Sequence, residues 1–181
     1  MFKKLLFICF PVFTLLVSSC EEPFCNCITD SDYATTTTKP KSAIQSIYSE
    51  LKGNLTKASI KLSDDGKSLR ILIPDVLFFK TNVASAPVAD TIIEVLSVSL
   101  KKYNQLQVIS SGHTDTKGTD SYNEQLSKAR AETGKTLLLN KGIASNRIEI
   151  KWYGASDPIA SNEDEAGRAQ NRRTEYILYE H

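Results

Sequence analysis

Apolar residues recur along the chain in two periodic patterns, one at the spacing of helices and one in short strand-like runs. Apolar side chains recur at helical spacing within residues 44–55 and 88–103, which predicts an amphipathic helix in each range. A longer helix is predicted to start near Ser121, where Ser121 and Glu124 match the pattern of a capping box, and to end before Gly142. The residues expected on the apolar face of this third helix are Leu126, Ala129, Thr133, Leu137 and Leu138.

Strand-like runs accompany these helices. Residues 58–62 and 69–73 flank Asp65-Gly66, and Asp-Gly between alternating apolar residues is a strong hairpin signal; Pro74 closes the second run. Further strands are predicted at 106–110, 147–153 and 174–179, with polar loops at 112–120 and 154–173. The order of these elements predicts a single α/β (α+β) domain, a βαβαββ sandwich with its helices on one face of a mixed sheet.

The N-terminal segment has the pattern of an export signal. Lys3 and Lys4 precede a nearly unbroken apolar run over residues 5–17, which is too short to span a bilayer but has the length of a signal's apolar core. The Val-Ser-Ser before Cys20 resembles the lipobox of bacterial lipoproteins. That resemblance implies cleavage before Cys20 and acylation of its sulfur, which would anchor the chain in the outer membrane with its domain facing the periplasm. The alternative is an ordinary signal with an incidental cysteine.

Cleavage would change the charge of the chain and leave a tether. Loss of residues 1–19 changes the formal net charge from +1 to −1 because it removes two lysines, and a near-neutral chain without a basic stripe is not predicted to bind nucleic acid. Residues 21–40 lack apolar periodicity, so they are predicted to be a linker that reaches about 70 Å when fully extended. Cys25 and Cys27 are interpreted as tether residues, with a local or intermolecular disulfide as the alternative.

The most informative stretch is a series of sequence blocks between residues 111 and 173. It contains Gly112-His113-Thr114-Asp115-Thr116-Lys117-Gly118, then Asn123-Glu124-Gln125-Leu126-Ser127-Lys128-Ala129-Arg130-Ala131, and then Gly167-Arg168-Ala169-Gln170-Asn171-Arg172-Arg173. In this order and spacing, the blocks resemble the OmpA C-terminal-like family, which includes the peptidoglycan-associated (Pal-like) lipoproteins. The predicted organisation is therefore a lipoprotein signal peptide at 1–19, a lipidated tether at 20–40, an N-terminal helix and hairpin strand at 41–66, and an OmpA-like peptidoglycan-binding domain at 67–181.

The resemblance implies that Asp115 and Arg130 hold the diaminopimelate of a peptidoglycan stem peptide. The residues themselves support this chemistry, because Asp115 lies in a loop ahead of a helix and Arg130 lies roughly two to three turns into it. Such a site offers a carboxylate to an ammonium group and a planar guanidinium to a carboxylate. The alternative is an internal salt bridge with no ligand. In the ligand-free state, we expect Asp115 and Arg130 to pair with each other.

Three further residues are candidate ligand contacts by the same resemblance, namely Thr114, Asn123 and Phe78. Asn123 stands where the family has an asparagine, and the alternative is that it simply starts the helix. The family commonly has an aromatic residue with an acidic one after the first strand. Residues 76–82 keep the aromatic as Phe78 but contain no acidic residue, so no acidic contact is expected from this wall of the groove.

Other chemistry-bearing residues are interpreted as structural. His113 is expected to be a hydrogen-bonding residue, because one histidine without a second ligand or a nucleophile supports neither a metal site nor a general base. Arg168, Arg172 and Arg173 are expected to clamp the loop by donating to turn carbonyls and carboxylates, with a place in the groove as the alternative. No catalytic residue, metal or cofactor is predicted.

The leading hypothesis is a non-catalytic, peptidoglycan-binding outer-membrane lipoprotein that tethers the membrane to the cell wall. One alternative is a lipoprotein that binds protein partners in an envelope machine. Another is a peptidoglycan hydrolase, which would need a zinc cluster, a Cys–His pair or two flanking carboxylates. The sequence contains two histidines and shows no such cluster, so it disfavours the hydrolase.

Overall fold

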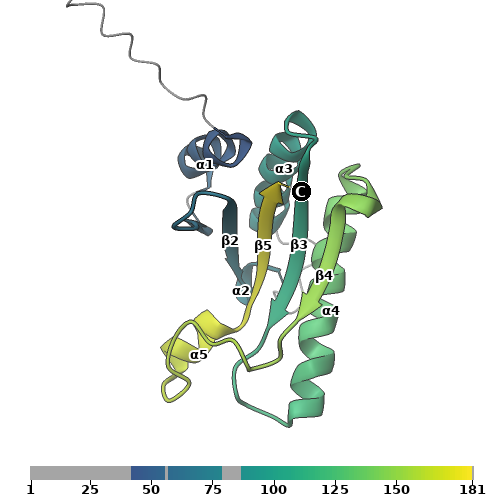
Figure 1. Cartoon of the computed structure of the whole chain (residues 1–181). Helices are drawn as coiled ribbons and strands as arrows, with labels where there is room; N and C mark the ends of the chain where they lie inside the picture. Colours follow the sequence, from purple (N-terminus) through teal and green to yellow (C-terminus); the bar gives the residue numbers. More distant parts are fainter. Residues whose placement is uncertain (1–41, 56, 79–86, 181) are drawn as a thin grey trace, which may run out of the picture. The chain divides into compact units, whose positions relative to one another are not determined.

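A five-stranded mixed sheet forms the centre of the protein (Figure 1). The computed structural model describes residues 42–55, 57–78 and 87–180, all within one compact unit, Thr38–His181. In sheet order, the strands are β1 (Ser59–Leu62), β2 (Ser68–Pro74), β5 (Arg173–Glu180), β3 (Leu106–His113) and β4 (Ile148–Trp152). β3 and β4 are parallel, and the other neighbouring strands are antiparallel.

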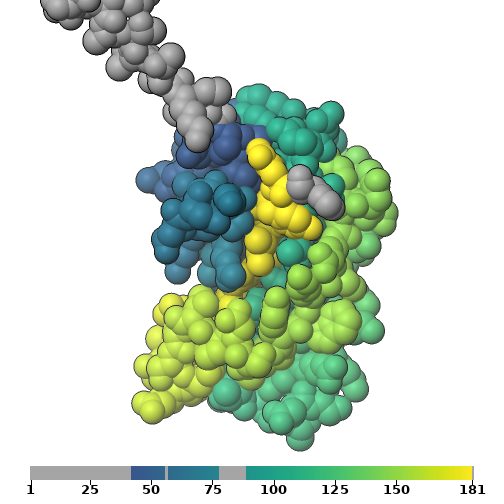
Figure 2. Space-filling model, viewed as in Figure 1, coloured from purple at the N-terminus to yellow at the C-terminus, as the bar shows by residue number. Residues whose placement is uncertain are grey.

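The helices α1 (Ala43–Asn54), α3 (Pro87–Lys102) and α4 (Asp120–Asn140) pack on one face of this sheet. Ile47 of α1 and Leu96 of α3 share an apolar cluster with strand residues such as Ile71 and Tyr176. Side chains alternate between the two faces of a strand, so every second residue of β5 points the other way. On that opposite face, atoms of β5 are visible at the surface in Figure 2. The predicted fold class is confirmed.

Local chemistry explains where the first elements begin and turn. Ser42 caps α1, and its hydroxyl accepts a hydrogen bond from the backbone N–H of Gln45 at 3.2 Å in a capping box. The predicted hairpin joins β1 to β2, and Gly66 takes a positive φ of 68° there. Its N–H donates to the carbonyl of Ser63 at 2.9 Å, which closes the turn. The predictions of this helix and this hairpin are confirmed.

The long helix α4 differs from its prediction in two respects. Its N-cap is Thr119, whose hydroxyl accepts from the N–H of Tyr122 at 3.2 Å, so the predicted capping box at Ser121 is wrong. The predicted apolar face is partly wrong, because Ala129 is exposed while Leu126, Thr133 and Leu137 are half-buried. Leu138 is the member of that face that is fully buried. The buried stripe consists of Asn123, Ser127, Arg130, Ala131, Gly134 and Leu138.

Close approach between α4 and β3 accounts for this polar, small-residue stripe. A Cβ on Gly112 would lie 1.9 Å from the carbonyl oxygen of Ser127, and one on Gly134 would lie 2.4 Å from the hydroxyl of Ser110. The helix therefore meets the strand through backbone and small side chains, and a stripe of leucines would not fit.

Three short elements were not predicted: α2 (Asp75–Phe78), α5 (Glu165–Asn171) and the 3₁₀ turn at Ser145–Arg147. The expected loop at 154–173 contains α5, which Asp164 caps by accepting from the N–H of Gly167 at 2.6 Å. Among the described helices, none combines the length and the apolar character needed to cross a membrane. The predicted signal and tether, with Cys20, Cys25 and Cys27, lie outside the described residues, as does the side chain of Phe78.

Candidate ligand-binding site

The sequence blocks that identified the site meet where β3 ends and α4 begins. The β3–α4 loop starts at Thr114, whose N–H donates to the carbonyl of Gly154 at 2.8 Å, so the segment after β4 lies against this loop. Asp75, the first residue of α2, donates its N–H to the carbonyl of Arg172 at 2.9 Å. This bond joins α2 to the end of α5. Four segments that are far apart in sequence thus surround one end of the sheet.

Asp115 is buried, with 5% of its surface exposed, and both of its carboxylate oxygens are engaged. One oxygen accepts from the N–H of Lys117 at 3.0 Å, and the other accepts from Nη1 of Arg172 at 2.7 Å. Arg172 also donates to Glu165 at 2.8 Å. Asp115 first and then Glu165 raise the pKa of the Arg172 guanidinium above its ordinary value. The carboxylate of Asp115 is therefore held in one orientation and kept close to a cation.

Glu165 extends this chain of charges toward solvent. Its carboxylate binds Arg172, Arg168 and Lys117, with N–O distances of 2.8, 3.0 and 3.3 Å. These three cations lower its pKa from 4.5 to about 2, Arg172 most and Lys117 least. Glu165 is exposed, so it steadies Arg172 from the rim of the site and leaves the deeper contact to Asp115.

Arg130 is also buried, with 4% exposed, and Asp75 binds it in a bidentate pair. Nε and Nη2 donate to the two oxygens of Asp75 at 2.9 and 2.7 Å, while Nη1 donates to the carbonyl of His113 at 2.9 Å. The expectation that Asp115 and Arg130 pair with each other in the ligand-free state is wrong. Each binds another partner, because α2 brings Asp75 to Arg130 and α5 brings Arg172 to Asp115. We call Asp75, Asp115, Arg130 and Arg172 the ion-pair cluster.

Sequence reasoning missed Asp75 and underrated Arg172. No acidic contact was expected after the first strand of the domain, yet Asp75 stands three positions before the aromatic Phe78 and binds Arg130. The strand register supplies what the sequence lacked, because Asp75 follows Pro74 at the end of β2 and Pro74 pairs with Arg173. That pairing places Asp75 beside the arginines that close the domain.

Two predicted contact residues carry polar groups without partners. Thr114 is 3% exposed, and its hydroxyl is buried with no hydrogen-bond partner. Asn123 is also 3% exposed, and no hydrogen bond of its side-chain amide is found with any described residue. Most buried polar groups in proteins are hydrogen-bonded, so such groups at the edge of a charged site are the kind that a ligand satisfies.

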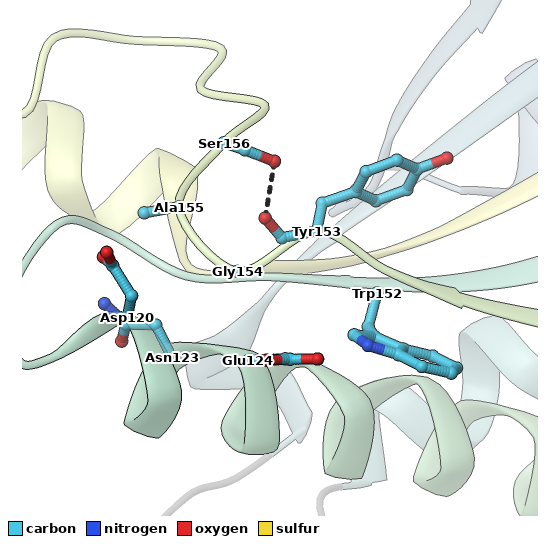
Figure 3. A pocket seen from close by; sticks show the side chains of 8 residues that line it. All are labelled: Asp120, Asn123, Glu124, Trp152, Tyr153, Gly154, Ala155 and Ser156. Carbon is cyan, nitrogen blue, oxygen red and sulfur yellow. Dashed lines mark hydrogen bonds between the residues drawn. The ribbon is translucent and has the colours of Figure 1, made fainter.

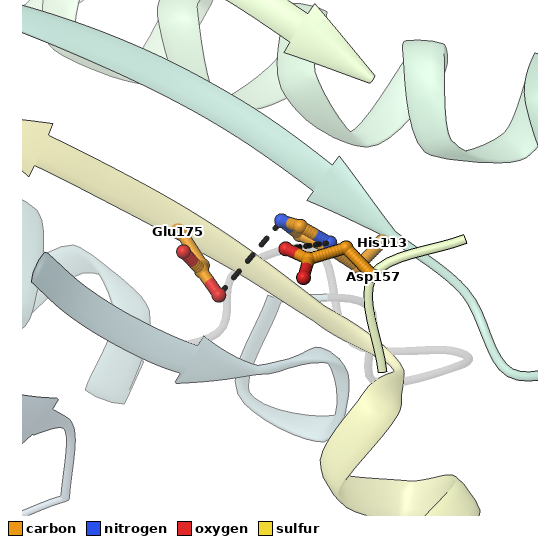
Figure 4. Close-up of side chains that lie close together, drawn as sticks. All are labelled: His113, Asp157 and Glu175. Atoms are coloured by element: carbon orange, nitrogen blue, oxygen red, sulfur yellow. Dashed lines mark ion pairs between the residues drawn. The ribbon is translucent and has the colours of Figure 1, made fainter. Parts of the chain in front are cut away.

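His113 lies on the other face of the sheet in a separate cluster with Asp157 and Glu175 (Figure 4). Its Nδ1 lies 3.7 Å from Asp157 and its Nε2 lies 3.8 Å from Glu175, while its ring stacks on Tyr153 with centroids 5.0 Å apart. Burial first, and then the nearby arginines with Arg173 foremost, lower the pKa of His113 from 6.5 to about 3.

The positive charge in this second cluster comes from arginine. Arg173 is 1% exposed and donates to Glu175 at 2.6 Å and to the carbonyl of Asp157 at 3.0 Å. Arg70 lies 3.5 Å from the second oxygen of Glu175. The expected structural role of His113 agrees with this packing, since its ring fills a buried position beside these ion pairs.

The arginine clamp predicted for the last loop is confirmed for Arg168 and Arg173. Arg168 donates to the carbonyls of Asn162 and Glu163, both at 2.8 Å. Asn171 is fully buried, and its side-chain oxygen accepts from the N–H groups of two residues in the same loop. The loop that presents Arg172 is therefore fixed from both sides.

Comparison with known proteins places the chain in a family. Residues 80–172 match the OmpA family. Over 120 residues, the chain is 32% identical to a peptidoglycan-associated lipoprotein of Mesorhizobium japonicum, with 66% of this chain and 71% of that protein covered. It is 43% identical over 83 residues to outer membrane porin F of Pseudomonas fluorescens, with 46% of this chain but only 26% of the porin covered. The chain thus spans about a quarter of the length of that relative.

Solved structures agree with this assignment. The peptidoglycan-associated lipoprotein from Burkholderia pseudomallei matches with a TM-score of 0.51 and 26% identity, over 62% of this chain and 89% of that one. A putative MotB like protein from Desulfovibrio vulgaris matches with a TM-score of 0.65 and 23% identity, over 77% and 92% of the two chains, which supports the fold alone. This chain belongs to the OmpA family.

Proposed function

We propose that this protein is a non-catalytic outer-membrane lipoprotein that binds peptidoglycan through the diaminopimelate of its stem peptide. The observation that carries the proposal is the buried carboxylate of Asp115, fixed between the Lys117 N–H and Arg172, at the position that the family motif assigns to ligand binding. The relatives that are named peptidoglycan-associated lipoproteins support the same reading.

The ion-pair cluster gives this proposal a physical mechanism. An amino-acid end of the ligand carries an ammonium beside a carboxylate, and the cluster already holds two charge pairs, Asp115–Arg172 and Arg130–Asp75. On binding, the ammonium takes Asp115 and the carboxylate takes a guanidinium, so two internal ion pairs are exchanged for two ligand contacts. The displaced Asp75 and Arg172 are partly exposed, with 21% and 30% of their side chains accessible, and Arg172 keeps Glu165, so no fully buried charge loses its partner.

The unpartnered groups beside the cluster add specificity. Thr114 precedes Asp115 in the loop, and its buried hydroxyl can bond a ligand carboxylate or amide. Asn123 offers both a donor and an acceptor from the start of α4. A ligand with one charge of each sign and amide groups between them satisfies all of these residues.

Sedimentation with purified sacculi tests the proposal. Asp115→Asn keeps the shape but removes the charge that faces the ammonium, and Arg130→Ala removes the guanidinium. Truncating one partner of a desolvated charge pair costs about 2–5 kcal/mol, and the lower figure is already about a thirtyfold loss of affinity. Both variants should stay in the supernatant while still unfolding cooperatively. Asp64→Asn, on the exposed hairpin turn, is the matched control and should sediment like the unaltered protein.

Normal sacculus binding by folded Asp115→Asn and Arg130→Ala proteins would contradict the site. Asp75→Asn then tests the exchange itself. It removes the charge that competes for Arg130, so binding should be kept or become tighter. Release of soluble muropeptides during the same assay would instead indicate a hydrolase.

The lipid anchor is tested separately. Cys20→Ala should abolish processing by the lipoprotein peptidase and release the protein from membranes, because acyl chains supply the membrane affinity. Retention of the substituted protein on membranes washed with high salt would overturn the anchor and leave the peptidoglycan site unaffected.

A further inference from the structure

A hollow beside the candidate site contains none of the four residues of the ion-pair cluster. It is a cavity of about 530 Å³ between the first turn of α4 and the segment that follows β4 (Figure 3). Its lining consists of Asp120, Asn123, Glu124, Trp152, Tyr153, Gly154, Ala155 and Ser156. The carbonyl of Gly154 in this lining accepts a hydrogen bond from the N–H of Thr114, so one wall of the cavity is bonded to the loop that carries Asp115.

The chemistry of this lining is aromatic and hydrogen-bonding. Trp152 is 39% exposed, and Figure 3 shows it at one end of the cavity, with Asp120 at the other. Glu124 lies between them on α4, so carboxylate oxygens stand near the indole ring. The ammonium of Lys128 lies 5.2 Å from the centre of the same ring. Asn123 lines the cavity as well, and no hydrogen bond of its side-chain amide to a described residue is found, so the amide can bond a ligand here.

We propose that this cavity binds a sugar of the peptidoglycan glycan strand, with Trp152 as its stacking wall and Asp120 and Glu124 as acceptors for its hydroxyl and amide groups. The inference rests on the proposed function and deepens it, because the stem peptide is attached to such a sugar. A protein that contacts both parts recognises the junction between peptide and glycan.

Charge favours the sugar over the rest of the stem peptide as the occupant. The lining holds two carboxylates, Asp120 and Glu124, and neither lysine nor arginine is among the lining residues. Stem peptides carry carboxylates of their own, which two lining carboxylates repel. An N-acetylated sugar is neutral apart from its substituents, presents hydroxyl and amide donors, and has an apolar ring face that packs on an aromatic side chain.

The chain contains a single tryptophan, so the emission of Trp152 reports on this cavity directly. The full-length protein in detergent is titrated with three probes: diaminopimelate, a diaminopimelate-containing tetrapeptide, and the same tetrapeptide on its N-acetylglucosaminyl-N-acetylmuramyl disaccharide. The disaccharide probe should bind about tenfold more tightly than the bare tetrapeptide, equivalent to about 1.4 kcal/mol, and should alone change the Trp152 emission.

Two variants test which residues supply the additional affinity for the disaccharide probe. By calorimetry, Trp152→Ala and Glu124→Gln should each remove most of the advantage of the disaccharide and leave binding of diaminopimelate unchanged. Glu132→Gln makes the same change on an exposed position of α4 outside the cavity and should behave as the unaltered protein. If the Trp152→Ala protein does not fold, the result for Glu124→Gln alone tests the sugar assignment.

The possible failures can be distinguished. Equal affinity and equal emission change for the two tetrapeptide probes would overturn the sugar assignment while keeping the proposed function. An equal loss for both probes in Glu124→Gln would make the cavity a peptide contact and would also overturn the sugar assignment. If none of the three probes binds the unaltered protein, the proposed function fails, and this inference fails with it.

Discussion

The two ends of strand β3 are equally buried but chemically opposite. At its start, Leu106 and Val108 are fully buried and belong to the apolar core shared with α1 and α3. At its other end, Ser111, His113 and, just beyond, Asp115 are nearly as inaccessible. Burial alone therefore does not distinguish a core from a site in this protein. The two ends differ in whether their buried atoms need hydrogen-bond or ion-pair partners.

This difference separates stability from recognition along one strand. At the apolar end, burial of hydrocarbon stabilises the fold at roughly 25 cal/mol per Å². At the polar end, every charge must recover its lost hydration through an ion pair, and replacing such pairs by hydrophobic residues is often neutral or stabilising. Stability therefore gives no reason for the ion-pair cluster to exist. The proposed exchange of these pairs with a ligand would give one.

Disrupting the close contact between α4 and β3 should have the largest effect on the free energy of unfolding. Gly112→Val places a Cβ only 1.9 Å from the carbonyl oxygen of Ser127. This oxygen belongs to the backbone of α4, so it cannot move without the helix. We expect a loss of about 5 kcal/mol or more, comparable with the whole stability of a small domain, and no cooperative melting transition. Gly53→Ala is the control, because nothing lies within 4 Å of a Cβ there. It should stabilise α1 by about 0.5–1 kcal/mol. A cooperatively folded Gly112→Val protein would contradict this prediction and show that α4 can move away from β3.

The second prediction tests whether the polar end contributes to stability. Arg173→Met leaves Glu175, which is 1% exposed, with Arg70 as its remaining arginine partner, so it should cost about 3–5 kcal/mol in chemical denaturation. The double variant Arg173→Met/Glu175→Leu removes both charges and should recover most of the loss. If the double variant is no more stable than Arg173→Met alone, the arginine acts through its bonds to the carbonyls of Asn171 and Asp157 and not through charge compensation.

The same contrast explains what the sequence could predict. The apolar end follows from periodicity, because Ile44, Ile47 and Leu51 recur at helical spacing and are all buried. The inner stripe of α4 does not follow, because Asn123, Ser127 and Gly134 have no apolar signal and are buried through backbone contact.

The candidate site shows the same limit. Asp115 and Arg130 stood out through their motif, and both are buried at the site. Their true partners did not stand out, because Asp75 and Arg172 lie 55 and 57 residues away in sequence from the groups they bind. The registers of β5 against β2 and against β3 bring them there. A local sequence pattern carries no information about a pairing of that range.

The third prediction concerns pH and has a smaller effect. The pKa of His113 is lowered from 6.5 to about 3 by burial, then by Arg173, Arg70 and Arg130, and this outweighs the carboxylates of Asp157 and Glu175 beside the ring. The unfolded chain therefore binds a proton that the folded one rejects. The stabilising contribution is complete above about pH 6.5 and is lost as the pH falls toward about 3.

Melting temperatures measured between pH 7 and pH 4 check this dependence. They should fall as the pH is lowered, and His113→Gln, which cannot be protonated, should have a shallower dependence over the same range. Glu165, whose pKa is lowered to about 2, contributes in the same direction but mainly below pH 4.5, so its part remains in the variant. An unchanged slope in His113→Gln would mean that carboxylates alone set the acid sensitivity.

The smallest expected effect comes from removing the N-terminal residues that precede the apolar end. A chain beginning at Lys41 lacks residues 21–40, which have little apolar surface to bury, so its melting midpoint should equal that of the mature protein. A chain beginning at Lys57 is the contrasting control. It also loses Ile44, Ile47 and Leu51, which are each at most 1% exposed in the core, and deletion of even one such side chain typically costs about 2–5 kcal/mol. This shorter chain should therefore melt far lower or not fold. A midpoint drop of many degrees in the chain from Lys41 would mean that the tether packs on the domain, and the apolar end would then extend beyond α1.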